Sequence, residues 1–502
     1  MQPSVSSTAQ RGKSAGKSAN DAAAGKAQPI TRRLGLFALT GMVIGSMIGG
    51  GAFNLASNMA AGAGLGAEII AWIVTGFGMF FLANTFRTLA DKRPDLSAGI
   101  YSYAREGFGR LTGFQIAWGY WLSSAFGNVA FAVLIMQTLS YFFPVFGNGQ
   151  NWPSLIGGSV LIWAMQFLVL SGVKRAAFLN SLAMVTKLAA LGVGIIVMIA
   201  YFKAGPFTTD IWGQTAKLGS VLSQVKSTML VTLWVFIGIE GAVVVSGRAD
   251  DSKTVGAATF LGLGICLAGY AALSILPFAT MGQPALAGLK NPSLAYVVEA
   301  LVGHWGAVFM ILSVLVSILS CWLAWTILVA ELPFVAAQDG VFPKFLAKEN
   351  KNHAAAPSLW VSTIVMQITM FVVLYAHDAW IFLLDITGVM ILPAYLASTA
   401  YLWKFGTSHT GTGSEGRNAM IWTGILGSVY AVWMLYAAGP AFLLLSAIMF
   451  AIGLPVYYYA ERETPNGRTS AFSGREAIGS GLLVAAAILA IVLFYMGIVT
   501  AN

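Results

Sequence analysis

Long apolar runs separated by short polar segments make up the chain from about residue 35 onward. Each run has about 18 or more residues with few charges, enough for a helix to cross the roughly 30 Å hydrocarbon core of a bilayer. The pattern predicts an all-α polytopic membrane protein with about thirteen transmembrane helices. The predicted spans are 35–61, 66–90, 110–143, 154–171, 177–202, 225–247, 256–280, 306–332, 358–376, 379–402, 419–437, 440–459 and 477–499.

The segment before the first span is polar. Residues 1–30 are rich in Ser, Ala, Gly and Lys and contain no apolar core. This is too polar for a signal peptide, so we expect a disordered cytoplasmic tail. In the whole chain 57% of the residues are hydrophobic and 9% are charged, whereas a soluble domain has roughly 25% charged residues. The composition excludes an ordinary soluble enzyme, and it excludes a nucleic acid as a partner.

The basic residues predict an orientation. If the N-terminus is cytoplasmic, most of the 28 Lys and Arg residues fall in the inner segments, as the positive-inside rule requires. The C-terminus is then outside, and a cell (inner) membrane is the expected location. Only four basic residues fall outside, namely Lys203, Lys217, Lys226 and Lys290.

Two predicted spans are interrupted near their middle. Gly45 and Gly49–Gly51 crowd the centre of span 1, and Gly238, Glu240 and Gly241 lie in span 6. Each glycine weakens a helix by roughly 1 kcal/mol relative to alanine, and unsatisfied backbone in lipid is costly. Tight packing through small residues would explain span 1 equally well. A carboxylate in a second glycine-rich span favours unwound segments that line a cavity.

The spacing of the two interruptions predicts the domain organisation. Interrupted helices five spans apart are typical of inverted-repeat transporters. Residues 31–205 (spans 1–5) and 206–405 (spans 6–10) would form the repeats, and 406–502 would add spans 11–13. Half-helix N-termini would offer N–H groups to a carboxylate, and free carbonyls would receive an amino group. This geometry suits an α-amino acid.

The same segments carry motifs that resemble a known superfamily. These are GSMIGGGAF in span 1, GxYxYAREGFG at Gly99–Gly109, LWVFIGIEG in span 6 and AWTILVAELPFVAAQDGVFP at the end of span 8. They resemble the amino acid–polyamine–organocation superfamily. Within it, the chain is most similar to basic amino acid/polyamine antiporters of the arginine/ornithine type. The resemblance implies the LeuT-type fold, built from five-plus-five inverted repeats, and alternating access.

The resemblance also implies which residues bind the backbone of an amino acid substrate. In the family, an unwound segment of span 1 binds the substrate carboxylate. The residues that match it here are Ile48, Gly49, Gly50 and Gly51. A second unwound segment of the family, in span 6, receives the α-amino group through its carbonyls. The residues that match it here are Ile237, Gly238 and Ile239. Gly50 stands where the family's arginine/agmatine member has a serine, so this part of the match is incomplete.

For the side-chain end of the substrate, the resemblance implies aromatic and small polar contacts. Trp234 matches an aromatic residue that stacks on a guanidinium, and Trp325 matches one in the pocket floor. Packing in the core or against lipid would also explain Trp234. The remaining matched positions near the cation are Asn128, Ser123 and Ser124.

Gating and proton coupling are implied for three further residues. Tyr120 matches a gating tyrosine and Glu240 a gating, proton-sensing carboxylate, although Glu240 could simply accept N–H groups of the broken helix. Lys187 in span 5 matches the lysine of proton-coupled members. Its alternative is to snorkel to the inner interface.

Two other carboxylates lie in or near the spans. Asp385 in span 10 would either recognise the distal cation of a substrate, cap its helix or bond to Thr387. Glu68 begins span 2, and we expect it to be solvated at the outer interface. Cys266 and Cys321 have no CxxC spacing, and the four histidines show no metal-ligand clustering, so neither a metal nor a cofactor is expected.

These observations predict a secondary transporter that exchanges cationic amino acids across the plasma membrane, with arginine/ornithine antiport as the leading hypothesis. The alternatives are proton-coupled symport, exchange of lysine, histidine or agmatine, and a membrane receptor that binds an amino acid without moving it. No GxSxG, HExxH or Walker motif indicates an enzyme. A homodimer stays open as the assembly.

Overall fold

The computed structural model describes residues 35–96, 99–172, 176–240, 252–408, 414–463 and 472–500. The predicted N-terminal tail (1–30) and Gly241 lie outside these ranges. Within them every regular element is a helix, as the apolar pattern predicts.

Nine helices of the described residues are long and apolar enough to cross a membrane, and a bent pair raises the number to ten. The nine are α3 (Leu65–Lys92), α5 (Arg110–Leu139), α6 (Trp152–Leu170), α11 (Ser252–Ile275) with η4 (Leu276–Ala279), α14 (His304–Gln338), α15 (Ala356–Val372) with η6 (Val373–Tyr375), α16 (Ala379–Ser408), α17 (Ser414–Glu463) and α18 (Gly474–Tyr495).

Four of the predicted spans need a closer comparison. α7 (Ala176–Ala200) and α9 (Val221–Trp234) correspond to spans 5 and 6, and residues 241–251 after α9 lie outside the described part. α17 covers both span 11 and span 12. It is bent at Gly439, whose φ of 78° is not helical and which precedes Pro440. The total of thirteen spans stays a prediction.

The first span is interrupted at the predicted glycines. α1 (Leu36–Met47) ends there, and the chain continues as η1 (Gly51–Asn54) and α2 (Leu55–Ala60) after a bend of 51°. The glycines allow close approach, since a Cβ atom on Gly50 would lie 2.5 Å from the Leu134 side chain. A Cβ atom on Gly51 would lie 2.3 Å from the indole of Trp234.

The sixth span leaves its helix in the same way. α9 ends at Trp234 and turns follow as far as Glu240. Gly238 has a φ of +108°, and a Cβ atom there would lie 2.6 Å from the Ser46 carbonyl oxygen of span 1. Only glycine tolerates both the backbone conformation and the contact. The two interrupted segments therefore lie against each other.

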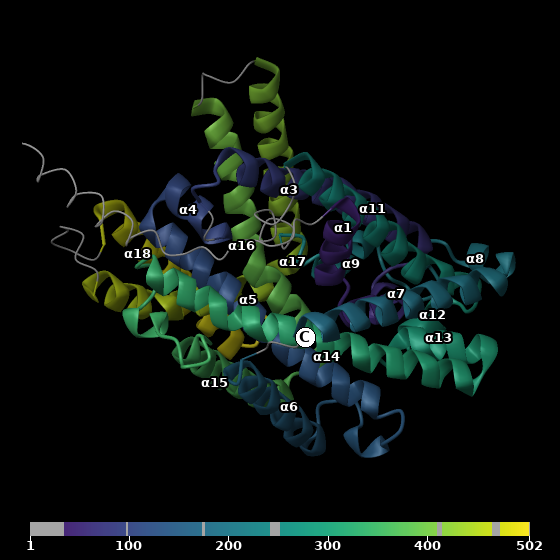
Figure 1. Cartoon of the computed structure of the whole chain (residues 1–502). Coiled ribbons are helices and arrows are strands. Elements are labelled where there is room, and N and C mark those ends of the chain that lie inside the picture. The colour runs from purple at the N-terminus through teal and green to yellow at the C-terminus, as the bar shows by residue number, and fades with distance from the viewer. Residues whose placement is uncertain are drawn as a thin grey trace, which may run out of the picture.

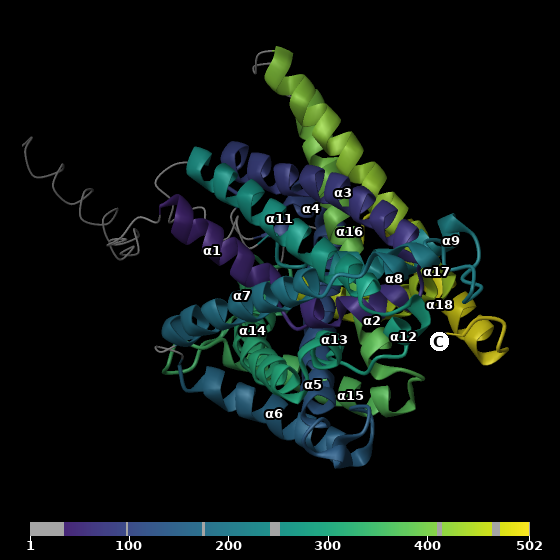
Figure 2. The same cartoon turned by 90° about the vertical axis from the view of Figure 1, so that its right-hand side faces the viewer.

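Burial decides which helices are central. In α5, 89% of the most apolar window is buried, whereas in α18 the value is 11%. A helix that is apolar all round and buried belongs to the core, and one that is apolar and exposed faces lipid. α14 and α16 pack against α5, and α6 lies beside α15 along one edge of the molecule (Figures 1 and 2).

Short helices lie at the two ends of the bundle. α4 (Ile100–Phe108) lies at one end, and α8 (Ala204–Thr209), α12 (Gln283–Ala287) and α13 (Ser293–Val302) lie at the other (Figure 1). At the α4 end, Arg93 donates to Asp95 and Tyr401, and it forms an ion pair with Glu106 at 3.5 Å. Arg93 thus joins the end of α3 to α16 and α4. The remaining short helices are η2 (Pro144–Phe146) and η5 (Lys344–Ala347).

Candidate functional site

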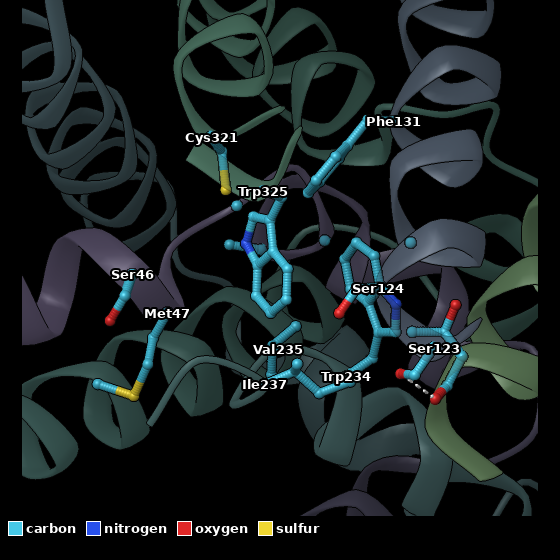
Figure 3. Close-up of a pocket in the computed structure, with 15 residues that line it drawn as sticks. Ser46, Met47, Ser123, Ser124, Phe131, Trp234, Val235, Ile237, Cys321 and Trp325 are labelled. Carbon is cyan, nitrogen blue, oxygen red and sulfur yellow. Dashed lines mark hydrogen bonds between the residues drawn. The ribbon is translucent and has the colours of Figure 1, made fainter. Parts of the chain in front are cut away.

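A cavity with about 450 Å³ of empty space lies where the two interrupted segments meet α5, α14 and α16 (Figure 3). It is lined by Ser46, Met47, Gly49, Gly51, Ala52, Ser123, Ser124, Gly127, Phe131, Trp234, Val235, Ile237, Cys321, Trp325 and Thr387.

No charged side chain is among the described residues that line the cavity. A ligand with charged groups would therefore meet backbone dipoles, hydroxyl groups and aromatic faces. Gly49 and Gly51 of span 1 and Ile237 of span 6 line it, as predicted. The structure does not place the other predicted members of the two interrupted segments at the lining, namely Ile48, Gly50, Gly238 and Ile239.

A serine that sequence reasoning missed joins the two interrupted segments. The Ser46 hydroxyl donates to the Gly238 carbonyl oxygen at 3.0 Å, and Ser46 also lines the cavity. The Gly238 carbonyl belongs to the segment expected to receive an amino group. Ser46 therefore occupies an acceptor that a ligand ammonium group could use. Ser46 is a polar residue in the glycine-rich motif GSMIGGGAF, and this could have marked it as a candidate.

Lys187 supports the interrupted part of span 1 from α7. Its ammonium group donates to the carbonyl oxygens of Gly45 and Ile48, both at 2.8 Å. The side chain is 1% exposed, so the alternative in which it snorkels to the interface is wrong. Because α1 ends at Met47, these carbonyls lie where the helical hydrogen bonds stop. The lysine holds the unwound backbone in place.

The aromatic side chains form one wall of the cavity. The Trp234 ring lies edge-on to Phe131 and Trp380, with centroid separations of 6.1 and 5.3 Å. Trp234 and Trp325 face the cavity from different segments (Figure 3). A lipid-facing position for Trp234 is therefore wrong. Two indoles and a phenyl ring give the cavity a surface that suits a flat cation.

Hydroxyl-bearing residues of α5 and α16 also line the cavity. Ser123 donates to the Thr387 carbonyl oxygen at 2.8 Å, and Ser124 donates to that of Tyr120 at 2.9 Å. The Thr387 hydroxyl is buried and has no hydrogen-bond partner among the described residues. Since Thr387 lines the cavity, its hydroxyl is free for a ligand. Sequence reasoning did not select it, although it lies two residues after Asp385.

Asn128 and Asp385 do not line the cavity. The Asn128 amide donates to Ser124 O at 2.7 Å and accepts from Thr326 at 3.2 Å, which connects α5 to α14. The helix cap considered for Asp385 is made instead by Asp378, which accepts from the Ile381 N–H at 3.0 Å. A direct role of Asn128 or Asp385 in binding stays a prediction.

Glu240 anchors a polar cluster beside the cavity. Its carboxylate accepts hydrogen bonds from the Tyr120 hydroxyl at 2.8 Å, the Tyr395 hydroxyl at 3.1 Å and the Gly238 N–H at 3.2 Å. The carboxylate thus accepts an N–H of the broken helix and also contacts Tyr120, and a gating role for the two residues stays a prediction. Tyr395 is a further member that sequence reasoning missed. The cluster ties span 6 to α5 and α16.

The predicted solvation of Glu68 is wrong. Its side chain is 0% exposed, and Ser274 of α11 lies beside its carboxyl group. Residues 211–213 pack against the start of α3, where the Gly66 N–H donates to Ile211 O at 2.8 Å and the Trp212 indole lies against Gly66. The sequence places Glu68 at the end of a span but does not show which segments pack against it.

The fold and this cavity define a class of protein. Nine or ten helices of the described residues are long and apolar enough to cross a membrane, and two interrupted segments border a small cavity among them. The chain belongs to the amino acid permease family, whose model matches residues 34–452. It is therefore a multi-pass membrane transporter and not an enzyme, and membership implies the LeuT-type fold.

Several relatives of known name are similar over nearly the whole chain. The arginine/agmatine antiporter of Chlamydia felis is 49% identical over 471 residues, covering 92% of this chain and 97% of the relative. The antiporter of the same name from Chlamydia abortus is 50% identical with the same coverage. That from Chlamydia pneumoniae is 48% identical over 475 residues, covering 93% of this chain and 98% of the relative.

Proposed function

We propose that the protein is an antiporter that exchanges arginine for a second cationic amine by alternating access. The cavity supports this proposal because unwound backbone and aromatic faces line it together. The glycine segment Gly49–Gly51 would bind the carboxylate of arginine. The indole of Trp234 would stack on the guanidinium, and the Thr387 hydroxyl would donate or accept one hydrogen bond.

The observation that carries the proposal is the chemistry of the cavity lining. Buried charges need partners, and none of the described side chains that line the cavity is charged. A guanidinium spreads its charge over a plane and is more weakly hydrated than an ammonium. Arginine therefore suits the aromatic wall better than lysine does.

The exchanged partner decides whether the transport moves charge. The sequence resemblance favours ornithine, which like arginine carries one net positive charge, so one-for-one exchange would be electroneutral. The names of the relatives favour agmatine, which has lost the carboxylate and carries two positive charges. Exchange of arginine for agmatine would therefore respond to a membrane potential.

The Glu240 cluster and Arg93 support a gating role on the side of the cavity that faces α4. Opening on either side requires spans 1, 2, 6 and 7 to move against spans 3, 4, 8 and 9. The bond from Glu240 of span 6 to Tyr120 of span 3 crosses that boundary, and the bond to Tyr395 joins span 6 to span 10. We propose a cytoplasmic N-terminus, which would place α4 and Arg93 on the inner side.

The test is counterflow in proteoliposomes loaded with ornithine, agmatine or neither. We expect arginine uptake only into loaded vesicles. A potassium diffusion potential that accelerates uptake into agmatine-loaded but not ornithine-loaded vesicles would identify the exchanged pair. Arginine binding without counterflow would support a receptor, and equal uptake into empty vesicles would contradict exchange.

A further inference from the structure

A second cavity lies away from the interrupted segments, between α15 and the end of α17. The end of α14, the short helix η5 and the first half of α5 complete its lining. Its volume is about 430 Å³, within the range of about 300–1,000 Å³ that pockets for small molecules usually have. This α15–α17 crevice shares no lining residue with the substrate cavity.

The α15–α17 crevice has a buried floor and an exposed rim. On the floor, Trp121 of α5 is 4% exposed and Phe342 is 2% exposed. At the rim, Phe345 of η5 is 45% exposed and Tyr459 of α17 is 52% exposed. Both α15 and α17 are long and apolar enough to cross a membrane, and each packs against α5. The crevice therefore opens sideways, toward the lipid.

The depth of the crevice matches one leaflet of a bilayer. On α15 its lining ends at Val365, nine residues after the helix begins at Ala356, and on α17 it begins at Pro455, eight residues before Glu463 ends that helix. At 1.5 Å per residue these stretches are about 12–14 Å long, close to half of the roughly 30 Å hydrocarbon core. Because η5 packs against α15 and its first N–H donates to Glu463 at 2.7 Å, both helix ends lie on the same side.

The polar groups inside the crevice are already engaged. The Trp118 indole donates to a carbonyl oxygen of α17 at 2.9 Å, and the Trp121 indole donates to the Ser362 hydroxyl at 2.8 Å. The Ser358 hydroxyl donates to a carbonyl oxygen of α14. The remaining hydroxyl of the lining, that of Tyr459, lies at the exposed rim. A polar ligand would lose its hydration here without gaining hydrogen bonds, whereas a hydrocarbon chain would lose nothing.

Two lysines lie at the polar end of the crevice. Lys344 lies between two lining residues, and Lys348 follows η5; both are exposed. The nearby acidic groups have other contacts, because Glu461 pairs with an arginine of α5, Glu463 accepts from a backbone N–H, and Glu349 contacts the histidine four residues on. The two ammonium groups thus have no ion-pair partner among the described residues.

We propose that the α15–α17 crevice binds one acyl chain of an anionic phospholipid whose phosphate contacts Lys344 and Lys348. Basic pockets between membrane helices attract the anionic lipids of the cytoplasmic leaflet, and the proposed cytoplasmic N-terminus places this end of the bundle on the inner side. The chain fills the space between α15 and α17 and packs against α5 and α14. These two helices carry Ser123 and Trp325, which line the substrate cavity.

The test is lipid binding to the purified full-length chain in detergent, followed by native mass spectrometry. Dioleoyl phosphatidylglycerol and dioleoyl phosphatidylcholine are titrated separately, because they share their chains and differ in headgroup charge. Val361→Trp fills the crevice from α15. Its matched control is Val160→Trp, because Val160 lines a different exposed groove, between α6 and α15, and neither of these helices contains Lys or Arg.

The charges are tested in the same assay. Lys344→Gln and Lys348→Gln remove the two ammonium groups singly and together. The matched control is Lys351→Gln, because Lys351 is also exposed but belongs to the loop that bonds to the end of α6. Binding is measured without transport, so an exchange assay that refutes arginine antiport would leave this result in place.

We expect the native chain to retain one phosphatidylglycerol molecule more tightly than phosphatidylcholine. Each lysine removed should weaken phosphatidylglycerol binding about fivefold and leave phosphatidylcholine binding unchanged. Val361→Trp should weaken the binding of both lipids at least about tenfold, and both control variants should bind as the native chain does.

Equal affinity for the two lipids, unchanged binding in Val361→Trp, or an equal loss in Val160→Trp or Lys351→Gln would overturn the proposal. A dimer that Val361→Trp dissociates would also overturn it, because a second copy would then cover the crevice. If Val361→Trp does not fold, Val456→Phe fills the crevice from α17 instead.

Discussion

The contact between Trp234 and a guanidinium can be separated from simple packing by comparing two ligands. The perturbation is Trp234→Phe, which keeps an aromatic ring in the cavity, and Trp234→Leu, which removes the π face. The ligands are arginine and citrulline. Citrulline has nearly the same shape but carries a neutral ureido group, so any cost of altered packing should affect both ligands alike.

The magnitude follows from the environment of the ring. Trp234 is 8% exposed and lies against Gly51, Phe131 and Trp380. A desolvated cation–π contact with Trp is worth about 2 kcal/mol, which corresponds to roughly 30-fold in affinity. Trp234→Leu should therefore lower the ratio of arginine to citrulline affinity about 30-fold. Trp234→Phe should lower this ratio less, because Trp is the best cation–π partner.

Equilibrium binding to the purified protein, with labelled arginine and citrulline as competitor, measures this ratio. Trp380→Phe is the matched control. Trp380 is fully buried behind Trp234 and does not line the cavity, so its substitution should change both affinities by the same factor. If Trp234→Leu also left the ratio unchanged, Trp234 would contribute shape only, and the argument for a guanidinium would fail.

Three further predictions test the backbone and the gate. Lys187→Met removes two hydrogen bonds from a charged donor, each worth about 1.5–3 kcal/mol, so arginine affinity should fall at least about tenfold; an unchanged dissociation constant would contradict this. Gly51→Ala places a Cβ atom 2.3 Å from the Trp234 ring and should abolish binding, whereas Gly264→Ala, with no atom within 4 Å, should bind normally in the same assay. Glu240→Gln presents an amide N–H to groups that all donate, so it should slow counterflow at least about tenfold. Tyr395→Phe removes only one hydrogen bond of about 1 kcal/mol, so it should slow counterflow about fivefold. A larger effect of Tyr395→Phe than of Glu240→Gln would argue against Glu240 as the centre of the gate.

The sequence reveals the interrupted segments because their cause is local. Glycine weakens a helix wherever it occurs, so Gly49–Gly51 and Gly238 mark the unwound segments without any knowledge of their neighbours. A helix that crosses the lipid must be long and apolar, so the sequence also shows where such helices lie. Trp234 could be selected because it lies four residues before such an interruption. These predictions needed only the chain itself and the properties of a bilayer.

Residues that act through partners distant in sequence could not be found this way. Tyr395 and Thr387 gain their roles because α16 passes beside α5 and the sixth span, and no motif around either residue indicates this contact. Lys187 could be selected, but only the approach of α7 to Gly45 and Ile48 distinguishes a buried donor from a snorkelling lysine.

Glu68 shows the limit most clearly. In the sequence it begins a span, and a carboxylate at a span end is ordinarily solvated. Only the tertiary structure buries its side chain, beside Ser274 from more than 200 positions away. Apolar pattern and glycine content determine where helices form and where they break, because both depend on neighbours in the chain. Burial of an individual charge depends on what folds over it, and that was decided by the packing of the whole molecule.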